Sequence, residues 1–232
     1  MITNRSFLTN IKQEMPPYAA KIYSTMVADG SKLVYERFIA ELMSRMSSPY
    51  SLVDVGCGPG HVTELLARRL AQGKVVGIDL SEVLIGIARK KRERLDNLKF
   101  EVGNALNLPY SNETFDGAVS VNSIKAWSGQ QLGVDEMTRV VRSGAKVAIF
   151  ECDPECSKEA AQNFCSLWRM TMGLPGHVVA RMGRAWHFRK FVASGGLRHL
   201  ELRELLLNAG LIEIESFSYS DQPFSFAIGT KL

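Results

Sequence analysis

An apolar segment that ends in an acid and three alternating glycines constrains the fold of this chain more than any other feature. Residues 53–60 read Val-Asp-Val-Gly-Cys-Gly-Pro-Gly, and a helical pattern begins near His61. Glycine is required where the backbone takes a positive φ or where a ligand approaches the main chain closely. A strand, a glycine turn and a helix N-terminus in this order form the ligand-binding edge of a doubly wound α/β sheet. The segment therefore predicts that fold, with a nucleotide-like ligand at the turn.

The glycine spacing separates this turn from two other nucleotide-binding loops. A dinucleotide-binding G-x-G-x-x-G sequence would place His61 at its third glycine position. A phosphate-binding P-loop requires Gly-Lys-Ser/Thr, and no lysine follows these glycines. The pattern of residues 54–60 instead resembles motif I of the class I S-adenosylmethionine-dependent methyltransferases. The resemblance implies cofactor contacts from Asp54, Gly56, Gly58 and Gly60.

Two downstream segments extend the resemblance. Residues 74–79 read as a short buried strand that ends in Asp79, about 20 residues past the glycines, where such folds place a carboxylate on ribose hydroxyls. The segments 100–105 and 108–110 resemble the family's third motif, except that an amide replaces its acid. The resemblance implies that further cofactor contacts come from Leu80 on the adenine face, from Asn104 and Ala105 at the adenine edge, and from Val121 beside the methionine moiety.

The alternation of strand and helix patterns predicts a parallel sheet. We expect strands at 50–55, 74–79, 98–103, 115–121, 145–152, 211–218 and 223–230, and helices at 33–46, 61–71, 82–94, 130–141 and 200–209. The resemblance implies a Rossmann-like, doubly wound sheet of seven strands in the order 3-2-1-4-5-7-6, with the last strand antiparallel. We expect an N-terminal leader over 1–32, a core made of 33–152 and 199–232, and a helical cap inserted after strand five over 153–198.

Composition excludes several classes of protein. The chain has 232 residues, of which 46% are hydrophobic and 22% charged, so disordered and fibrous classes are disfavoured. The net charge of +4 is too small to indicate a nucleic-acid-binding protein by itself. The basic run 89–94 is expected to be solvated at a helix C-terminus, where cations complement the helix dipole.

The cysteines and the N-terminal residues bear on location. The four cysteines do not indicate a disulfide framework, the first residues lack the apolar core of a signal peptide, and no apolar run is long enough to span a bilayer. We therefore expect a cytoplasmic protein.

The sequence of the expected cap indicates the chemical class of the methyl acceptor. Residues 161–199 contain no acid, six basic residues and many aromatic and methionine side chains. Such a lining fits a small, partly apolar acceptor, and the arginines are compatible with an anionic group on it. The alternative is that the apolar residues pack the cap on the sheet and the cations are solvated. The substrate-binding candidates are Tyr18 and Tyr23 in the leader, Lys125 after strand four, for which an exposed loop lysine is the alternative, and Trp168, Arg181 and Trp186 in the cap.

Methyl transfer is an in-line displacement, so the protein mainly aligns the reacting groups. A base is needed only if the acceptor loses a proton. His177 and His187 in the cap are the candidates for such a base, with a structural role as the alternative for each, and His61 is expected beside the cofactor. Many relatives carry Leu-His-His after strand four, which residues 124–127 of this chain lack.

The resemblance is nearest to the small-molecule methyltransferases of ubiquinone and menaquinone biosynthesis, and it implies S-adenosylmethionine as cofactor. Nothing in the sequence predicts a catalytic metal. Three alternatives stay open. Bases of an RNA could stack on cap aromatic residues such as Trp186. A metalloid could bind the thiols of Cys152, Cys156 and Cys165, although their spacing matches no zinc pattern. A methyltransferase fold could also serve as a non-catalytic binding module.

Overall fold

The structure is a computed structural model, and it describes residues 24, 31–46, 50–92, 94–172 and 193–232. Among these residues, none of the helices combines the length and the apolar character needed to cross a membrane.

Seven strands and the helices between them make up the described chain. The strands are β1 (Ser51–Val55), β2 (Lys74–Asp79), β3 (Leu98–Val102), β4 (Phe115–Val121), β5 (Val141–Cys152), β6 (Leu211–Ser218) and β7 (Phe224–Lys231). The α-helices are α3 (Lys32–Arg45), α4 (His61–Arg69), α5 (Glu82–Arg92), α6 (Gln130–Val140), α7 (Lys158–Met172) and α10 (His199–Asn208), and the 3-10 turns are η2 (Ile124–Ala126) and η4 (Ala193–Gly195). Expected and observed boundaries mostly agree within two residues.

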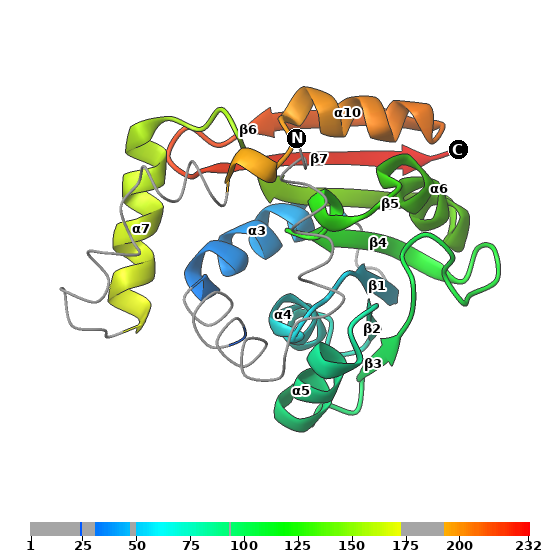
Figure 1. The fold of residues 1–232 in the computed structure, drawn as a ribbon. Coiled ribbons are helices and arrows are strands. Elements are labelled where there is room, and N and C mark those ends of the chain that lie inside the picture. The colour runs from blue at the N-terminus through cyan, green and yellow to red at the C-terminus, as the bar shows by residue number, and fades with distance from the viewer. Residues whose placement is uncertain (1–23, 25–30, 47–49, 93, 173–192) are drawn as a thin grey trace.

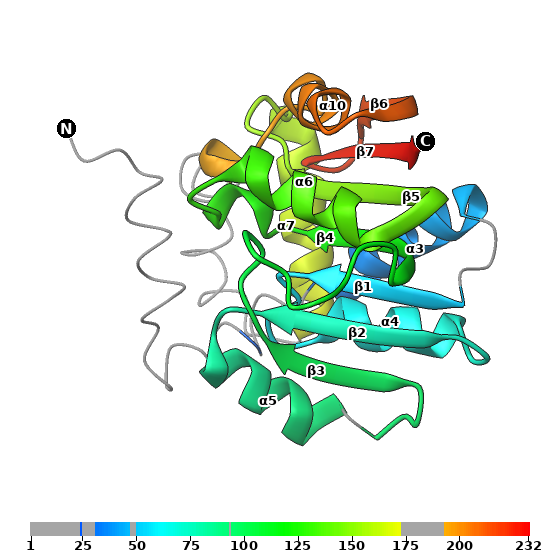
Figure 2. The ribbon, with the colours of Figure 1, turned by 90° about the vertical axis from the view of Figure 1, so that its right-hand side faces the viewer.

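The strands form one sheet in the order β3-β2-β1-β4-β5-β7-β6, which confirms the expected order. Strands β1 to β5 are mutually parallel, and β7 runs antiparallel to both β5 and β6. Figure 2 shows the strands stacked from β3 to β6, and Figure 1 shows the same sheet with helices on both sides. Because parallel strands end at one edge of the sheet, the residues that follow β1, β2, β3 and β4 meet there.

Each face of the sheet is covered by its own group of helices. One hydrophobic cluster joins α3, α4, α5 and α7 to one face, and a second joins α6 and α10 to the other. The central strands are therefore buried on both sides and carry continuous apolar runs, as covered parallel strands do. The burial of β1 is typical, since four of its five residues are buried.

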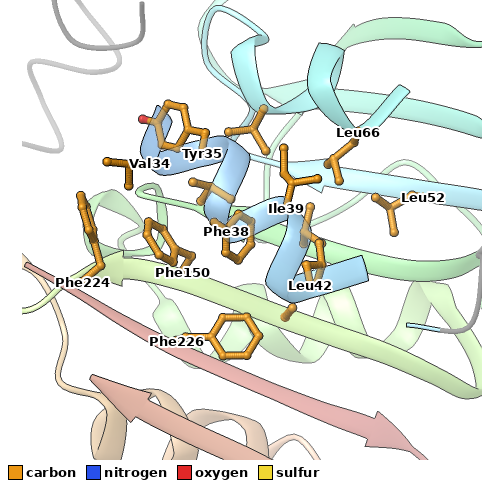
Figure 3. Packing of buried hydrophobic residues seen from close by; sticks show 14 of the residues in the cluster. Val34, Tyr35, Phe38, Ile39, Leu42, Leu52, Leu66, Phe150, Phe224 and Phe226 are labelled. Carbon is orange, nitrogen blue, oxygen red and sulfur yellow. The ribbon is translucent and has the colours of Figure 1, made fainter. Parts of the chain in front are cut away.

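The aromatic part of the first cluster lies between α3 and the β5–β7 pair. The ring centroids of Phe38 and Phe150 are 4.6 Å apart, as are those of Phe150 and Phe224, and Phe38 also meets the edge of Phe226. Figure 3 shows Phe38 of α3 lying among these phenylalanines of β5 and β7. Full burial of such rings is worth about 1.5–3 kcal/mol each. Helix α3 is thereby fixed on the sheet, and its first turn is held beside the ligand-binding edge.

Two details of the expected helices differ from the structure. In the helix expected at 33–46, the apolar residues at helical spacing are Leu33, Val34, Phe38, Leu42 and Met46. Leu33 is nevertheless 47% exposed, whereas Tyr35 is buried. In the basic run, Arg89 donates to Phe100 O and Arg92 donates to Pro59 O at 2.9 Å. The expectation that the whole run is solvated is wrong, because these two guanidinium groups bind backbone carbonyls instead.

The first part of the expected cap packs on the sheet. Ala161, Phe164 and Cys165 of α7 belong to the same buried cluster as α3, and the Phe164 ring meets the edge of Phe224. These side chains fit the alternative in which apolar cap residues pack on the core. Residues 173–192 lie outside the described residues, and so does the leader apart from Ser24 and residues 31–32.

Candidate functional site

A pocket with an empty volume of about 1130 Å³, part of it open to solvent, lies at the carboxyl edge of the parallel strands. Its walls come from the segments after β1, β2, β3 and β4 and from the first turn of α3. Of the nine residues expected to contact the cofactor, eight line it: Asp54, Gly56, Gly58, Asp79, Leu80, Asn104, Ala105 and Val121. The fold thus brings together groups that are up to 67 positions apart in the sequence (121 − 54 = 67).

Asp54, near the end of β1, places a buried carboxyl with a shifted pKa in the pocket wall. Its side chain is 1% exposed, Oδ2 accepts a hydrogen bond from Thr63 Oγ1 at 2.7 Å, and Oδ1 has no hydrogen-bond partner. Burial raises the pKa of this carboxyl to about 7, with Asp79 adding to the shift and Thr63 opposing it. A buried acceptor without a partner is costly, so Oδ1 is well suited to bind a cationic or hydrogen-bond-donating ligand.

Asp79 ends β2 and holds the glycine turn in place. Its Oδ2 accepts from the Gly58 backbone N–H at 2.9 Å and its Oδ1 accepts from the Ser81 N–H at 2.9 Å. Each carboxylate oxygen can accept more than one hydrogen bond, so a ligand hydroxyl can share the group. Ser81 caps α5 through its own hydroxyl, which accepts from Leu84 N.

The second and third glycines of the turn have different roles. Gly58 has φ +55, and a Cβ built on it meets nothing within 4 Å, so its backbone borders the open pocket. Gly60 has φ +81, but a Cβ there would lie 2.5 Å from the ring of Phe100. Gly60 is not part of the pocket wall and packs against Phe100 at the start of α4, and its contact with the cofactor stays a prediction.

The segments after β2 and β3 form the end of the pocket farther from β4. Leu80 is 45% exposed there, which suits an apolar face for a planar ring. Asn104 Oδ1 accepts from the Leu106 N–H at 2.9 Å in a local turn. An amide oxygen has two lone pairs, so Asn104 can hold this turn and still accept from a ligand amine.

The segment after β4 forms the opposite end of the pocket. Val121, Asn122 and Ser123 lie in its wall with Trp127, whose indole Nε1 donates to Ser123 Oγ at 3.0 Å. Asn122 takes the left-handed conformation, with φ +51, and its N–H donates to Phe150 O at 2.7 Å. Asparagine tolerates this conformation better than most residues.

Lys125 does not line the pocket. Its Nζ lies 2.5 Å from Oε1 of Glu151, its side chain is 12% exposed, and that of Glu151 is fully buried. The exposed-loop alternative for Lys125 is therefore wrong. Its ammonium is committed to this ion pair, and a contact between Lys125 and a substrate stays a prediction.

Two residues of the pocket wall carried little signal in the sequence. Tyr35 lies one position off the predicted apolar stripe of α3, and Trp127 stands in a segment that differs from the family pattern. His61, expected beside the cofactor, does line the pocket.

The cysteines are all free thiols, and Cys152, Cys156 and Cys165 are buried. Burial raises the pKa of Cys152 to about 11 and that of Cys57 well above its usual value. No cluster of three or more metal-ligating side chains occurs within the described ranges.

Several candidates from the sequence cannot be placed in the site. Trp168 lies in α7, but its side chain is not described. The other candidates outside the described residues are Tyr18, Tyr23, His177, Arg181, Trp186 and His187.

Comparison with protein-family models matches residues 47–204 to a methyltransferase domain. A demethylmenaquinone methyltransferase of Oceanobacillus iheyensis is 28% identical over 218 residues, which cover 90% of this chain and 92% of the relative. A demethylmenaquinone methyltransferase of Bacillus cereus (strain B4264) is 30% identical over 179 residues, which cover 76% of this chain and 73% of the relative.

Solved structures share the fold. An S-adenosylmethionine-dependent methyltransferase of Thermotoga maritima, described as a possible histamine N-methyltransferase, has a TM-score of 0.64 and 18% identity over 97% of this chain and 100% of its own. Phosphoethanolamine N-methyltransferase 2 of Haemonchus contortus, solved with S-adenosyl-L-methionine, has a TM-score of 0.65 and 14% identity over 100% of this chain and 60% of its own.

Proposed function

Because this chain belongs to the class I S-adenosylmethionine-dependent methyltransferases, we propose that it methylates a small, partly apolar acceptor of the demethylmenaquinone type. The observation that carries the assignment of the pocket is the unpaired Oδ1 of Asp54, which is buried in its wall. The amino-acid end of S-adenosylmethionine carries an ammonium group that suits this oxygen. The cofactor therefore fits the residues present.

We assign the other residues of the wall to different parts of the cofactor, which lie at the two ends of the pocket. Asp79 accepts hydrogen bonds from the ribose, and Leu80 with Asn104 and Ala105 holds the adenine. Gly56 and Gly58 let the backbone approach the ligand, and Val121 borders the methionine moiety beside β4. Charge-assisted hydrogen bonds such as those to Asp54 and Asp79 are worth about 1.5–3 kcal/mol each.

When bound, S-adenosylmethionine supplies a methyl group on a sulfonium, which an acceptor nucleophile takes by in-line displacement. The protein's part is to orient the acceptor and to exclude water, because alignment alone lowers the barrier substantially. The pocket wall near β4 serves this purpose with apolar groups from Val121, Ala126 and Trp127.

The acceptor is proposed from the relatives and from the sequence of the cap. The curated relatives are demethylmenaquinone methyltransferases, and an aromatic wall at Trp127 suits a ring-bearing acceptor. We propose that the substrate-binding candidates of the leader and cap close this side, with His177 or His187 as the base if the acceptor loses a proton. These candidates are Tyr18, Tyr23, Trp168, Arg181 and Trp186.

The metalloid alternative has less support. Soft metal and metalloid ions bind thiolates, and the raised pKa of Cys152 keeps that thiol protonated near neutral pH.

The proposed function is tested by methyl transfer from tritium-labelled S-adenosylmethionine to a reduced, short-chain demethylmenaquinone. Product formation should require the wild-type pocket and should fall at least tenfold in Asp79→Ala. Turnover of an RNA or of arsenite, with none of the quinol, would contradict the proposed acceptor.

A further inference from the structure

A chain of polar side chains lies beside the pocket where β4 and β5 end, and the roles assigned above do not use it. Cys152 Sγ donates to Asn122 Oδ1 at 3.3 Å, and the Asn122 side chain hydrogen-bonds Tyr35. Tyr35 is 6% exposed and Cys152 is 3% exposed. Tyr35 and Asn122 both line the pocket, so the chain runs from the interior to the ligand-binding space.

The orientation of both groups at the pocket is fixed by their neighbours. The Asn122 backbone is held at the end of β4 by its bond to Phe150 O, and the Cys152 thiol marks which side of the amide is the oxygen. The amide nitrogen is then directed toward Tyr35. Figure 3 shows the Tyr35 ring at the first turn of α3, with its hydroxyl pointing away from Phe38 and the other buried side chains.

Tyr35 stays a neutral hydroxyl at physiological pH. Burial raises the pKa of the phenol, with Cys152 adding to the shift, while hydrogen bonds from Asn122 and Ser31 and the charge of Lys125 oppose it. Hydrogen bonds that lower a phenol's pKa are donated to its oxygen. The phenol can therefore accept from Asn122 and donate its own proton to an oxygen or nitrogen of a ligand.

The pair lies on the acceptor side of the pocket. With the ribose at Asp79 after β2 and the adenine at Asn104 after β3, the methionine end of the cofactor lies toward β1 and β4. Asn122 follows β4, and Tyr35 reaches the pocket from α3, which packs on β5 and β7. In the orientation that the proposed function gives the cofactor, this end of the pocket is the one left for the acceptor.

We propose that Tyr35 and Asn122 form a specificity contact that selects methyl acceptors carrying an oxygen on an apolar ring. This inference rests on the proposed function, which orients the cofactor in the pocket. An apolar ring without that oxygen would cover the buried Tyr35 hydroxyl and offer no acceptor for its proton, which a site built for hydrogen bonding does not tolerate well.

The proposal is tested with two probes of the same shape, 1-naphthol and naphthalene. Their dissociation constants are measured by ligand-observed NMR on protein saturated with S-adenosylhomocysteine, and again without it. The variants are Tyr35→Phe and Asn122→Gly, because glycine keeps the left-handed backbone while it removes the amide. The matched control is Tyr110→Phe, a half-buried tyrosine whose hydroxyl donates to Glu101 at 2.7 Å and does not line the pocket.

We expect wild type and Tyr110→Phe to bind naphthol about tenfold more tightly than naphthalene, as one hydrogen bond allows. Tyr35→Phe and Asn122→Gly should lose this preference while they keep their affinity for S-adenosylhomocysteine within twofold. The inference is overturned if wild type shows no preference, if Tyr35→Phe retains it, or if Tyr35→Phe mainly weakens S-adenosylhomocysteine. A wild-type protein that does not bind S-adenosylhomocysteine contradicts the proposed function instead, and the probe preference measured without it still decides the role of Tyr35.

Discussion

Lys125 and Glu151 form a buried ion pair that joins the segment after β4 to the end of β5. The Lys125 Nζ lies 2.5 Å from Glu151 Oε1, and the Lys125 backbone N–H donates to Oε2 of the same carboxylate at 3.3 Å. Glu151 Oε1 also accepts from the Cys152 N–H at 2.8 Å. One carboxylate thus fixes the backbone on both sides of the pocket wall that contains Asn122.

Removal of one member of this pair should destabilise the fold strongly. Lys125→Met leaves the Glu151 charge buried and uncompensated, which costs about 3–5 kcal/mol. The free energy of unfolding is measured by urea denaturation. The matched control is Arg68→Met, which breaks an ion pair to Glu64 in which the arginine is 58% exposed and should cost at most about 1 kcal/mol. The double variant Lys125→Met/Glu151→Leu should be at least as stable as Lys125→Met, and equal losses for Lys125→Met and Arg68→Met would contradict the prediction.

Asp54 should give the ligand-free protein a distinct pH dependence. Its folded pKa of about 7 lies above the value near 3.8 expected when it is unfolded, so the folded state binds more protons between these two pH values. The contribution of this carboxyl to stability is complete below pH 4 and is lost as the pH rises toward 7, by at most about 1.4 kcal/mol per pH unit. Asp54→Asn lacks this titration, so its stability relative to wild type should increase from pH 5 to pH 7 and then level off. A constant difference across that range, measured by urea unfolding, would contradict the burial of an ionisable group here.

The same carboxyl should couple ligand affinity to pH. A ligand ammonium favours the ionised form of Asp54, so the affinity for S-adenosylhomocysteine should fall by up to about tenfold per pH unit below 7. Titration calorimetry at pH 5.5, 6.5 and 7.5 measures the effect. Asp54→Asn should bind S-adenosylhomocysteine more weakly at pH 7.5, and its affinity should depend less on pH. If the affinity of Asp54→Asn depended on pH as steeply as that of wild type, the titrating group would be another residue.

Alanine substitutions of Gly58 and Gly60 should differ in their effects on ligand affinity and on the stability of the fold. Alanine at either position carries a left-handed backbone cost of about 1–2 kcal/mol. Gly60→Ala adds overpacking against Phe100, worth about 1–3 kcal/mol more, and should leave ligand affinity nearly unchanged. Gly58→Ala places its methyl beside the ligand and should weaken S-adenosylhomocysteine binding with the smaller loss of stability. The prediction would be contradicted if Gly58→Ala lost more stability than Gly60→Ala, or if Gly60→Ala lost more affinity for S-adenosylhomocysteine than Gly58→Ala.

The ligand-binding edge could be predicted because it depends on local signals, whereas the prediction of the strand order rests on the resemblance to a known family. The glycine turn after β1 and the acid at the end of β2 stand next to strands whose apolar runs are unmistakable. Strand β5 begins at Val141 rather than near 145, because a shift of register in its pairing with β4 admits Gly144 with φ +80 into the strand. A pairing irregularity of this kind has no clear pattern in one sequence.

The rest of the site depends on contacts between distant segments. Lys125 and Glu151 are 26 residues apart, and their pairing requires that β4 and β5 are neighbours with a known register. Tyr35 reaches the pocket only because Phe38 of α3 packs on Phe150 of β5 and Phe226 of β7. Gly60 belongs to the expected motif, but its partner Phe100 comes from β3. Side-chain pairing across the sheet therefore decides which predicted residues line the pocket and which pack in the core.

The most direct test of this account is a calorimetric titration of S-adenosylhomocysteine into the wild-type protein and Asp79→Ala, with NAD as the competing ligand. We expect one site per chain in wild type, an affinity at least tenfold lower in Asp79→Ala because a charged hydrogen bond is lost, and no displacement by NAD. A wild-type protein that binds no S-adenosylhomocysteine, or that releases it to NAD, would contradict the assignment of the pocket.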